Sequence, residues 1–163
     1  MIHEVSGDIL LSKAAAIAHG VAPNDDFHHG LALALRERWP AMYRDFRHHC
    51  HQSHPKPGTL WTWSGPGPVR IVNLFTQESA PTHGGKPGRA TTAHVNHCLR
   101  ELHHLVETEK LASLALPRLA TGVGGLRWEE VEPLIRTQLA ALKIPVFLYV
   151  RFESGKAADE SAR

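Results

Sequence analysis

Three glycines in the stretch "LPRLATGVGGLRWEEV" (116–131) have the spacing of a ligand-binding loop. A short apolar run ends at Pro117, the glycines at 122, 124 and 125 follow, and a helical pattern begins at once. Glycines between a strand and a helix let several backbone N–H groups point at one spot, where the helix dipole adds about half a positive charge. A phosphate is the natural ligand of such a loop, and an ordinary tight turn is the alternative.

The common nucleotide-binding signatures do not explain this loop. No Gly-Lys-Ser/Thr follows it, as a P-loop requires, and "GVGGLRW" (122–128) does not match the G-x-G-x-x-G of a dinucleotide-binding fold. A second segment, "HGVAPNDDFHHGLALAL" (19–35), also runs from a predicted strand into a predicted helix, with Gly30 at the helix entry. Two glycine-bearing loops of this kind predict a diphosphate held between them.

A carboxylate near the N-terminus could recognise a base. Asp8 follows the first predicted strand, in "SGDIL" (6–10), where it could accept a hydrogen bond from an exocyclic amine such as that of adenine. A lone aspartate at such a position has a cap or turn as its alternative role. The sequence alone leaves both roles open.

Strand and helix patterns alternate along the chain and would position these residues. Strands are predicted at 2–5, 14–20, 58–64, 69–75, 111–117 and 146–150. Helices are predicted at 29–39, at 40–52 with Pro40 in the first turn, and at 89–109. A last helix carries Val131, Ile135 and Leu139 on one face and is predicted to begin just before Pro133. The alternation predicts an α/β fold, with a largely parallel sheet and helices on both sides.

The composition predicts one globular domain, over residues 1–153, followed by a polar tail at 154–163 that we expect to be frayed. Hydrophobic residues make up 42% and charged residues 21%, as in ordinary soluble proteins. The net charge of +2 is spread without a basic stripe for duplex DNA, and no apolar run approaches the ~18 residues of a membrane span. Two cysteines and no basic n-region predict a cytoplasmic protein, which we expect to be a monomer.

Two further clusters have structural explanations that we prefer. The segment "HHCHQSH" (48–54) invites a zinc site through His48, Cys50 and two more histidines, but it lacks a two-by-two ligand set, and we predict no metal. Trp61 and Trp63 share one face of a strand, where they could stack on nucleic-acid bases. No lysine or arginine cluster surrounds them, so we predict burial under a helix.

Taken together, these segments resemble the macrodomain family, whose members have an ADP-ribose-binding α/β/α fold. The resemblance runs from "VSGDIL" (5–10) to "VFLYV" (146–150) and includes "GLA" (30–32) and "PRLATGVGGLRW" (117–128). The chain is most similar to the branch containing the terminal ADP-ribose protein glycohydrolases, through "AH" (18–19), the loop end at Leu126 and Trp128, and Thr76-Gln77 after a strand. The resemblance implies a three-layer α/β/α macrodomain with a mixed, largely parallel central sheet.

The resemblance also assigns binding roles to individual residues. Asp8 would bind the adenine amine and the Ile9 N–H a ring nitrogen, with Val21 and Phe152 flanking the adenine. The diphosphate would lie between two sets of backbone N–H groups, and the second set would extend to the distal ribose. These sets are Gly30, Leu31 and Ala32 on one side, and Thr121, Gly122, Val123, Gly124 and Gly125 on the other, with His19 and Leu126 also at the pocket.

Catalysis is where this sequence departs from the family. Gln77 stands where active members of the nearest branch have a lysine, Gly124 where they have an aspartate, and Ala32 where another hydrolytic branch has its aspartate. We predict a hydrolase that removes ADP-ribose from glutamate or aspartate residues of proteins, without a cofactor. Its mechanism would be substrate-assisted, with the diphosphate as base and Gln77 orienting water or the ribose hydroxyls.

Four alternatives to this mechanism, function or acceptor stay open. A carboxylate among residues 24–26 could reach the distal ribose, although these residues are also typical turn formers. The chain could instead be a non-catalytic reader of ADP-ribose, or an ADP-ribose-1″-phosphatase. A nucleic-acid acceptor in place of a protein also remains open.

Overall fold

The computed structural model describes residues 1–81 and 85–161. The strands are β1 (Ile2–Gly7), β2 (Ala16–Val21), β3 (Leu60–Ser64), β4 (Arg70–Phe75), β5 (Leu114–Pro117) and β6 (Val146–Phe152). The helices are α1 (Gly30–Arg38), α2 (Pro40–Ser53), α3 (Thr92–Thr108) and α4 (Trp128–Leu139), with a short 3₁₀ turn, η1, at Ile9–Leu11. Each strand and α-helix expected from the sequence is present.

The strands form one mixed sheet in the order β1-β6-β5-β2-β4-β3, in which only β3 runs antiparallel to its neighbour. The carboxyl ends of the five parallel strands therefore share one edge. β2 and β5 pair only through Ala16 with Leu114 and Ile17 with Ala115. Beyond these pairs β2 continues along β4 and β5 continues along β6. The two middle strands thus part at the carboxyl edge, where open α/β sheets bind ligands.

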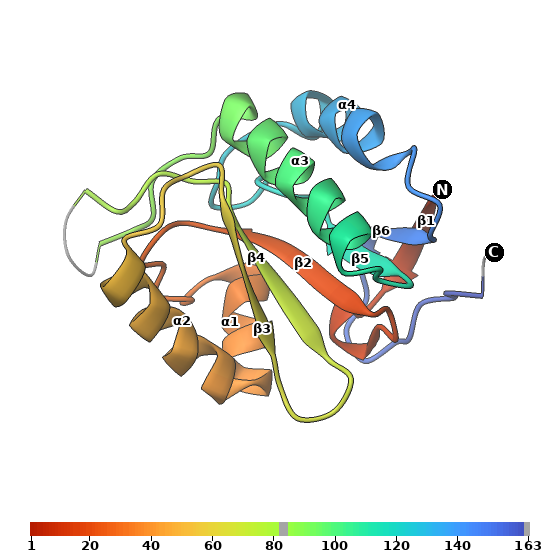
Figure 1. The fold of residues 1–163 in the computed structure, drawn as a ribbon, viewed down its shortest axis with the longest axis horizontal. Coiled ribbons are helices and arrows are strands. Elements are labelled where there is room, and N and C mark those ends of the chain that lie inside the picture. The colour runs from red at the N-terminus through yellow and green to blue at the C-terminus, as the bar shows by residue number, and fades with distance from the viewer. Residues whose placement is uncertain (82–84, 162–163) are drawn as a thin grey trace.

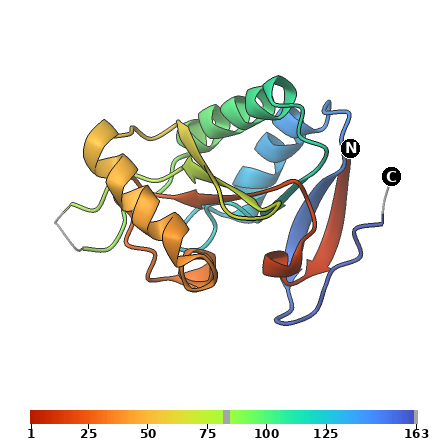
Figure 2. The ribbon, with the colours of Figure 1, turned by 60° about the horizontal axis from the view of Figure 1, so that its bottom comes forward.

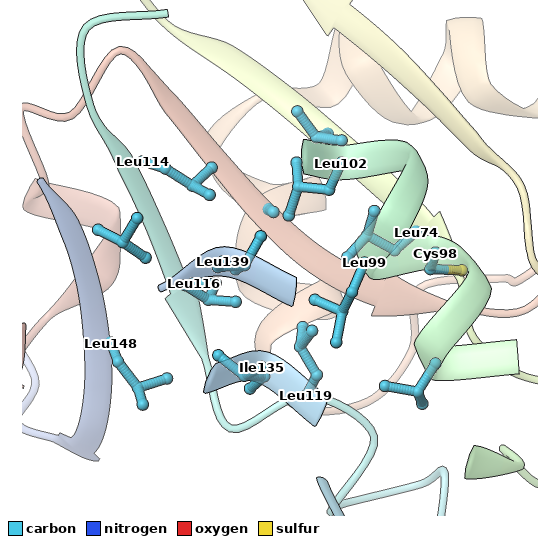
Figure 3. Packing of buried hydrophobic residues seen from close by; sticks show 14 of the residues in the cluster. Leu74, Cys98, Leu99, Leu102, Leu114, Leu116, Leu119, Ile135, Leu139 and Leu148 are labelled. Atoms are coloured by element: carbon cyan, nitrogen blue, oxygen red, sulfur yellow. The ribbon is translucent and has the colours of Figure 1, made fainter. Parts of the chain in front are cut away.

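Helices cover both faces of the sheet. Figures 1 and 2 show α3 and α4 on one face and α1 and α2 on the other. The core under α3 and α4 is aliphatic, because apolar residues recur every three or four positions on both helices and meet the strand leucines (Figure 3). Labelled members of this core are Leu74, Cys98, Leu99, Leu102, Leu114, Leu116, Leu119, Ile135, Leu139 and Leu148. The predicted three-layer α/β/α architecture is confirmed.

The core under α1 and α2 is rich in aromatic rings. Phe27, from the loop after β2, packs with its ring centroid 4.7 Å from that of Phe46 on α2, and Phe46 lies 5.9 Å from Phe75 on β4. Trp63 is buried and donates its indole N–H to Asp45 of α2 at 2.9 Å. The prediction that the strand tryptophans lie under a helix is confirmed for Trp63.

One predicted boundary is wrong. Helix α4 begins at Trp128, well before Pro133, which lies inside it. Proline removes one backbone donor from the helix, but the buried Val131 and the packing of Trp128 on the core hold the turn that precedes it. Local propensity was overridden by tertiary packing.

The predicted frayed tail is docked as far as the structure describes it. Glu160 accepts hydrogen bonds from the hydroxyls of Ser12 and Tyr149, both at 2.6 Å, and from the Lys13 N–H at 2.9 Å. Polar contacts attach the tail to the domain. Because such contacts leave no periodic pattern in the sequence, the tail shows no apolar periodicity. In the described part of the chain, no helix has the length and apolar character needed to cross a bilayer.

We expect Leu99→Ala to lower the free energy of unfolding by about 2–5 kcal/mol, because Leu99 is fully buried between α3 and the sheet and its loss leaves a cavity. Arg100→Ala, at an exposed position of the same helix, is the matched control and should change it by no more than about 0.5 kcal/mol. Urea unfolding followed by circular dichroism measures both. Equal effects of the two variants would contradict the packing described.

Candidate functional site

A groove with two lobes opens where β2 and β5 part. We call the "first loop" residues 22–29, after β2, and the "glycine loop" residues 118–127, after β5. The polar lobe is lined by His19 and Gly20, by both loops, by the first turn of α1 and by Gln77. The apolar lobe is lined by Gly7, Ile9, Gly30, Leu31, Ala34, Pro117, Tyr149 and Phe152. Gly30, Leu31 and Pro117 line both lobes, so the two form one continuous groove.

The glycine loop presents free backbone donors to the polar lobe. Its turn is braced by three bonds: Gly125 N–H to Gly122 O, Leu126 N–H to Ala120 O, and Ala90 N–H to Gly124 O, each at 3.0 Å. The N–H groups of Gly122, Val123 and Gly124 donate to no acceptor among residues 1–81 and 85–161. All three residues line the polar lobe, so their amides are available to an anion there.

The opposite wall of the groove carries a second set of donors. Helix α1 begins at Gly30, whose φ of +56° is strained for any residue with a side chain. The preceding His29 makes no side-chain cap, so the N–H groups of Gly30, Leu31 and Ala32 at the helix start lie open at the lobe. The N–H groups of the glycine loop and those at the start of α1, which the sequence predicted as two separate sets, therefore face one groove.

The apolar lobe has the character of a pocket for a planar base. Ile9, Tyr149 and the exposed Phe152 supply its apolar wall. Asp8 lines neither lobe; it is buried and caps η1, its Oδ1 accepting from the Leu10 N–H at 3.0 Å and its Oδ2 from the Gly155 N–H at 2.9 Å. Asp8 therefore has the cap role left open by the sequence. A carboxylate accepts about four hydrogen bonds, so binding an amine here as well stays a prediction.

Several predicted ligand residues lie outside the groove walls. Val21 is fully buried, and the Thr121 hydroxyl donates to Arg118 O at 2.9 Å instead of facing the lobe. Gly125 and Leu126 complete the turn of the glycine loop without lining either lobe. Conversely, the structure adds lining residues that the sequence did not single out. Among them are Gly20, Pro87 and Arg118 in the polar lobe and Tyr149 in the apolar lobe.

Position 124 has no room for a side chain. A Cβ placed on Gly124 would lie 2.7 Å from the Ala120 carbonyl oxygen and 3.0 Å from its Cα. Ala120 itself has a positive φ of +63°, and its carbonyl also accepts from Leu126, so this backbone is fixed. The glycine at position 124, where the resemblance expects an aspartate, is thus required by the turn.

Gln77 follows β4 and offers an oriented amide to the polar lobe. It is buried, and its Nε2 donates to Gly88 O at 3.1 Å, which fixes the orientation of the side-chain amide. Its Oε1 has no partner in the described part of the chain and can accept from a hydroxyl or a water. A neutral amide provides neither a nucleophile nor a base.

His19 is held as a neutral ring in the wall of the polar lobe. Its Nε2 lies 2.6 Å from Asn73 Oδ1, and the Asn73 amide donates to Trp61 O at 3.4 Å, which turns Oδ1 toward the ring. Nε2 is therefore the protonated nitrogen. Burial lowers the pKa of His19 to about 4, against the smaller raising effect of the Asn73 bond.

Asp25 is the one carboxylate in the described lining of the polar lobe. Its Oδ2 accepts from the Ala22 N–H at 3.0 Å and its Oδ1 from the Phe27 N–H at 2.9 Å. Burial raises the pKa of Asp25, and these two N–H bonds only partly oppose it. The neighbouring Asp26 instead pairs with His28 at 3.0 Å and lies off the lobe.

The histidine-rich end of α2 does not converge on a metal. Cys50 is fully buried in the core, whereas His48, His51 and His54 are exposed. Burial raises the pKa of the Cys50 thiol, which disfavours the thiolate that a metal would need. Within residues 1–81 and 85–161, no three histidine, cysteine or acidic side chains lie close enough to hold an ion.

The chain is similar to known proteins over most of its length. A family model described as "Macro domain" matches residues 15–135. A curated protein of Mycobacterium tuberculosis, named "DNA ADP-ribosyl glycohydrolase", is 30% identical over 135 residues, which cover 81% of this chain and 37% of that protein. The chain thus spans well under half the length of that relative.

Two further similarities concern the fold and a shorter segment. The solved "Macrodomain of Thermus aquaticus DarG" superposes with a TM-score of 0.80 at 27% identity, covering 92% of this chain and 98% of that chain. An "ADP-ribose 1''-phosphate phosphatase" of Ajellomyces capsulatus is 37% identical over 65 residues, covering 38% of this chain and 24% of that protein.

We expect Gly124→Ala to lower the free energy of unfolding by about 1–3 kcal/mol, because its methyl group would press on the Ala120 backbone. Gly122→Ala is the matched control, since a Cβ at Gly122 meets no atom within 4 Å. The control should change the stability by no more than about 0.5 kcal/mol in urea unfolding. If both variants were equally stable, the turn geometry would be wrong.

Acid should destabilise the protein through His19. Its folded pKa of about 4 lies below the ordinary 6.5, so the unfolded chain binds the proton more tightly and stability falls as the pH drops from 6.5 to about 4. The contribution lost is about 3 kcal/mol. We expect the difference in unfolding free energy between wild type and His19→Gln, which keeps a donor for Asn73, to shrink over this interval. A difference independent of pH would show that His19 is not buried in neutral form.

Proposed function

This chain belongs to the Macro domain family, and on that premise we propose that it binds ADP-ribose and hydrolyses the bond between the distal ribose and an acceptor group. The observation that carries the proposal is the continuous groove between β2 and β5. It joins an apolar lobe to a polar lobe, with backbone N–H groups on both sides of their junction. In ADP-ribose a base, a diphosphate and a polar sugar follow one another. This order matches the apolar lobe, the N–H groups and the polar lobe of the groove.

The proposed placement follows from the walls of the groove. Adenine lies in the apolar lobe against Tyr149 and Phe152. Its amine points toward Asp8, which caps η1 next to the lining residue Ile9. The diphosphate lies between Gly30–Ala32 and Gly122–Gly124, whose free N–H groups and helix dipole suit its charge. The distal ribose then reaches the polar lobe beside Gln77 and Asp25.

We propose hydrolysis at C1″ of the distal ribose, with an ester of glutamate or aspartate as the acceptor bond. An ester suits this site because a carboxylate leaves without needing a proton, and the polar lobe has no lysine among its described residues. The M. tuberculosis relative is named a glycohydrolase acting on DNA. This name supports a nucleic-acid base, bonded to the same C1″ atom, as the second acceptor to test.

A phosphatase is the second candidate activity. The A. capsulatus relative is named for removing phosphate from position 1″ of the same ligand, which a positioned water in the polar lobe could also do. Release of ADP-ribose from a protein or DNA distinguishes the hydrolase from release of inorganic phosphate.

We expect the wild-type chain to release ADP-ribose from a protein that is mono-ADP-ribosylated on glutamate, and Gly122→Glu to lose this release. The new side chain enters open space in the groove, so the fold is kept while its charge repels the diphosphate. Affinity for free ADP-ribose should fall at least about 100-fold, measured by calorimetry. Ala141→Glu, at an exposed turn before β6 on the opposite edge of the sheet, is the matched control and should bind and turn over normally.

Parallel reactions with ADP-ribosylated DNA and with ADP-ribose 1″-phosphate identify the acceptor. Release of ADP-ribose from DNA alone would show that the acceptor is a nucleic-acid base and not a protein ester. Release of inorganic phosphate alone would show that the activity is that of a phosphatase. Tight binding without any release would leave a reader of ADP-ribose. Absence of binding in the wild type would overturn the assignment of the groove.

A further inference from the structure

We infer that Asp25 is a catalytic residue, the general base that activates water against C1″ of the distal ribose. The inference rests on the proposed hydrolase function and supplies the base that this chain lacks at the family positions, where Gln77 and Gly124 stand.

Elimination within the polar lobe leads to this residue. The ionisable side chains in its described lining are His19, Asp25, His29 and Arg118. Arginine stays protonated and cannot accept a proton. His29 is exposed at the start of α1, and its ring makes no side-chain cap bond that would hold it in place. The choice falls between His19 and Asp25.

Burial acts in opposite directions on these two groups. A proton taken up by His19 creates a buried charge, which is why the pKa of this ring lies far below its ordinary value. A proton taken up by Asp25 removes a buried charge, and burial accordingly raises the pKa of this carboxyl. Asp25 is therefore the better temporary acceptor of the two.

The first loop holds the Asp25 carboxylate rigidly. One N–H bond to each oxygen, from Ala22 and Phe27, fixes the plane of the group and leaves lone pairs on both oxygens for a water. Phe27 is fully buried against Phe46, which anchors this end of the loop in the aromatic core. A base on an anchored loop keeps its position through the reaction.

The reaction balances with water as the only co-reactant. Asp25 takes a proton from water as the water oxygen bonds to C1″. The bond from C1″ to the acceptor oxygen breaks, and its electron pair leaves with the acceptor as a free carboxylate. Asp25 then returns the proton to solvent. In ¹⁸O water the label should enter ADP-ribose and not the released glutamate.

The pH dependence has a definite sign. Titratable groups facing Asp25 are Asp26 and His29 near it in sequence, Cys50 from α2, and His19 across the lobe. The active form of Asp25 is the carboxylate, so turnover should fall as the pH drops through its raised pKa. Replacing Asp25 by a group that does not titrate should remove this acidic limb.

The test compares Asp25→Asn with Asp26→Asn, its neighbour outside the lobe, on the glutamyl ester substrate. We expect Asp25→Asn, which keeps only one of the two backbone N–H bonds, to lower kcat about 100-fold or more and to flatten the acidic limb, with a much smaller change in the affinity for free ADP-ribose. Asp26→Asn should keep the rate and the limb. Formate added to Asp25→Ala should restore part of the rate, because a small carboxylate can occupy the vacated space.

Each outcome decides the inference. Full turnover by Asp25→Asn overturns it while leaving the hydrolase intact. Loss of ADP-ribose affinity and of thermal stability in Asp25→Asn, without rescue by formate in Asp25→Ala, assigns Asp25 to the architecture of the loop and also overturns it. Absence of turnover by the wild type overturns the proposed hydrolase, and the catalytic role of Asp25 with it.

Discussion

The parting of β2 from β5 is the constraint on which the rest of the structure depends. These strands share only two residue pairs, after which one follows β4 and the other follows β6. The loops that leave them must therefore diverge, and the space between them cannot be filled by the sheet. A groove at this point is a consequence of strand order, and the N–H groups of both loops line it because each loop has to turn there.

Burial gives two ionisable groups of the polar lobe opposite properties. His19 and Asp25 lie in the same lobe, yet one is held neutral by burial and the other has its proton affinity increased. The His19 ring is hydrogen-bonded to Asn73 on β4, so the sheet holds it in place. The Asp25 carboxylate accepts its described hydrogen bonds from residues of its own loop. Each of its oxygens therefore keeps a lone pair that is available to the lobe. A lobe whose described lining contains no lysine can in this way still offer a proton acceptor.

The chain after β6 is part of the architecture around the apolar lobe. The Asp8 carboxylate, which caps η1, also accepts a hydrogen bond from the Gly155 N–H. Glu160 accepts hydrogen bonds from Ser12 and from Tyr149, which lines that lobe. A Cβ on Gly7 would lie 2.8 Å from the backbone of Lys156 and Ala158, so the segment packs closely on the end of β1. The position of Asp8 thus depends on residues near both ends of the chain.

The sequence by itself determined the elements, their alternation and the two glycine loops, because these follow from local periodicity and from backbone freedom at glycine. It could not show that Asp8 caps η1, that residues 154–161 dock, or that α4 continues back through Pro133 to Trp128. Each of these depends on partners far along the chain. Only the tertiary structure placed Asp25 in the lobe and Asp26 outside it, since the Ala22 and Phe27 N–H groups hold one carboxylate and His28 pairs with the other.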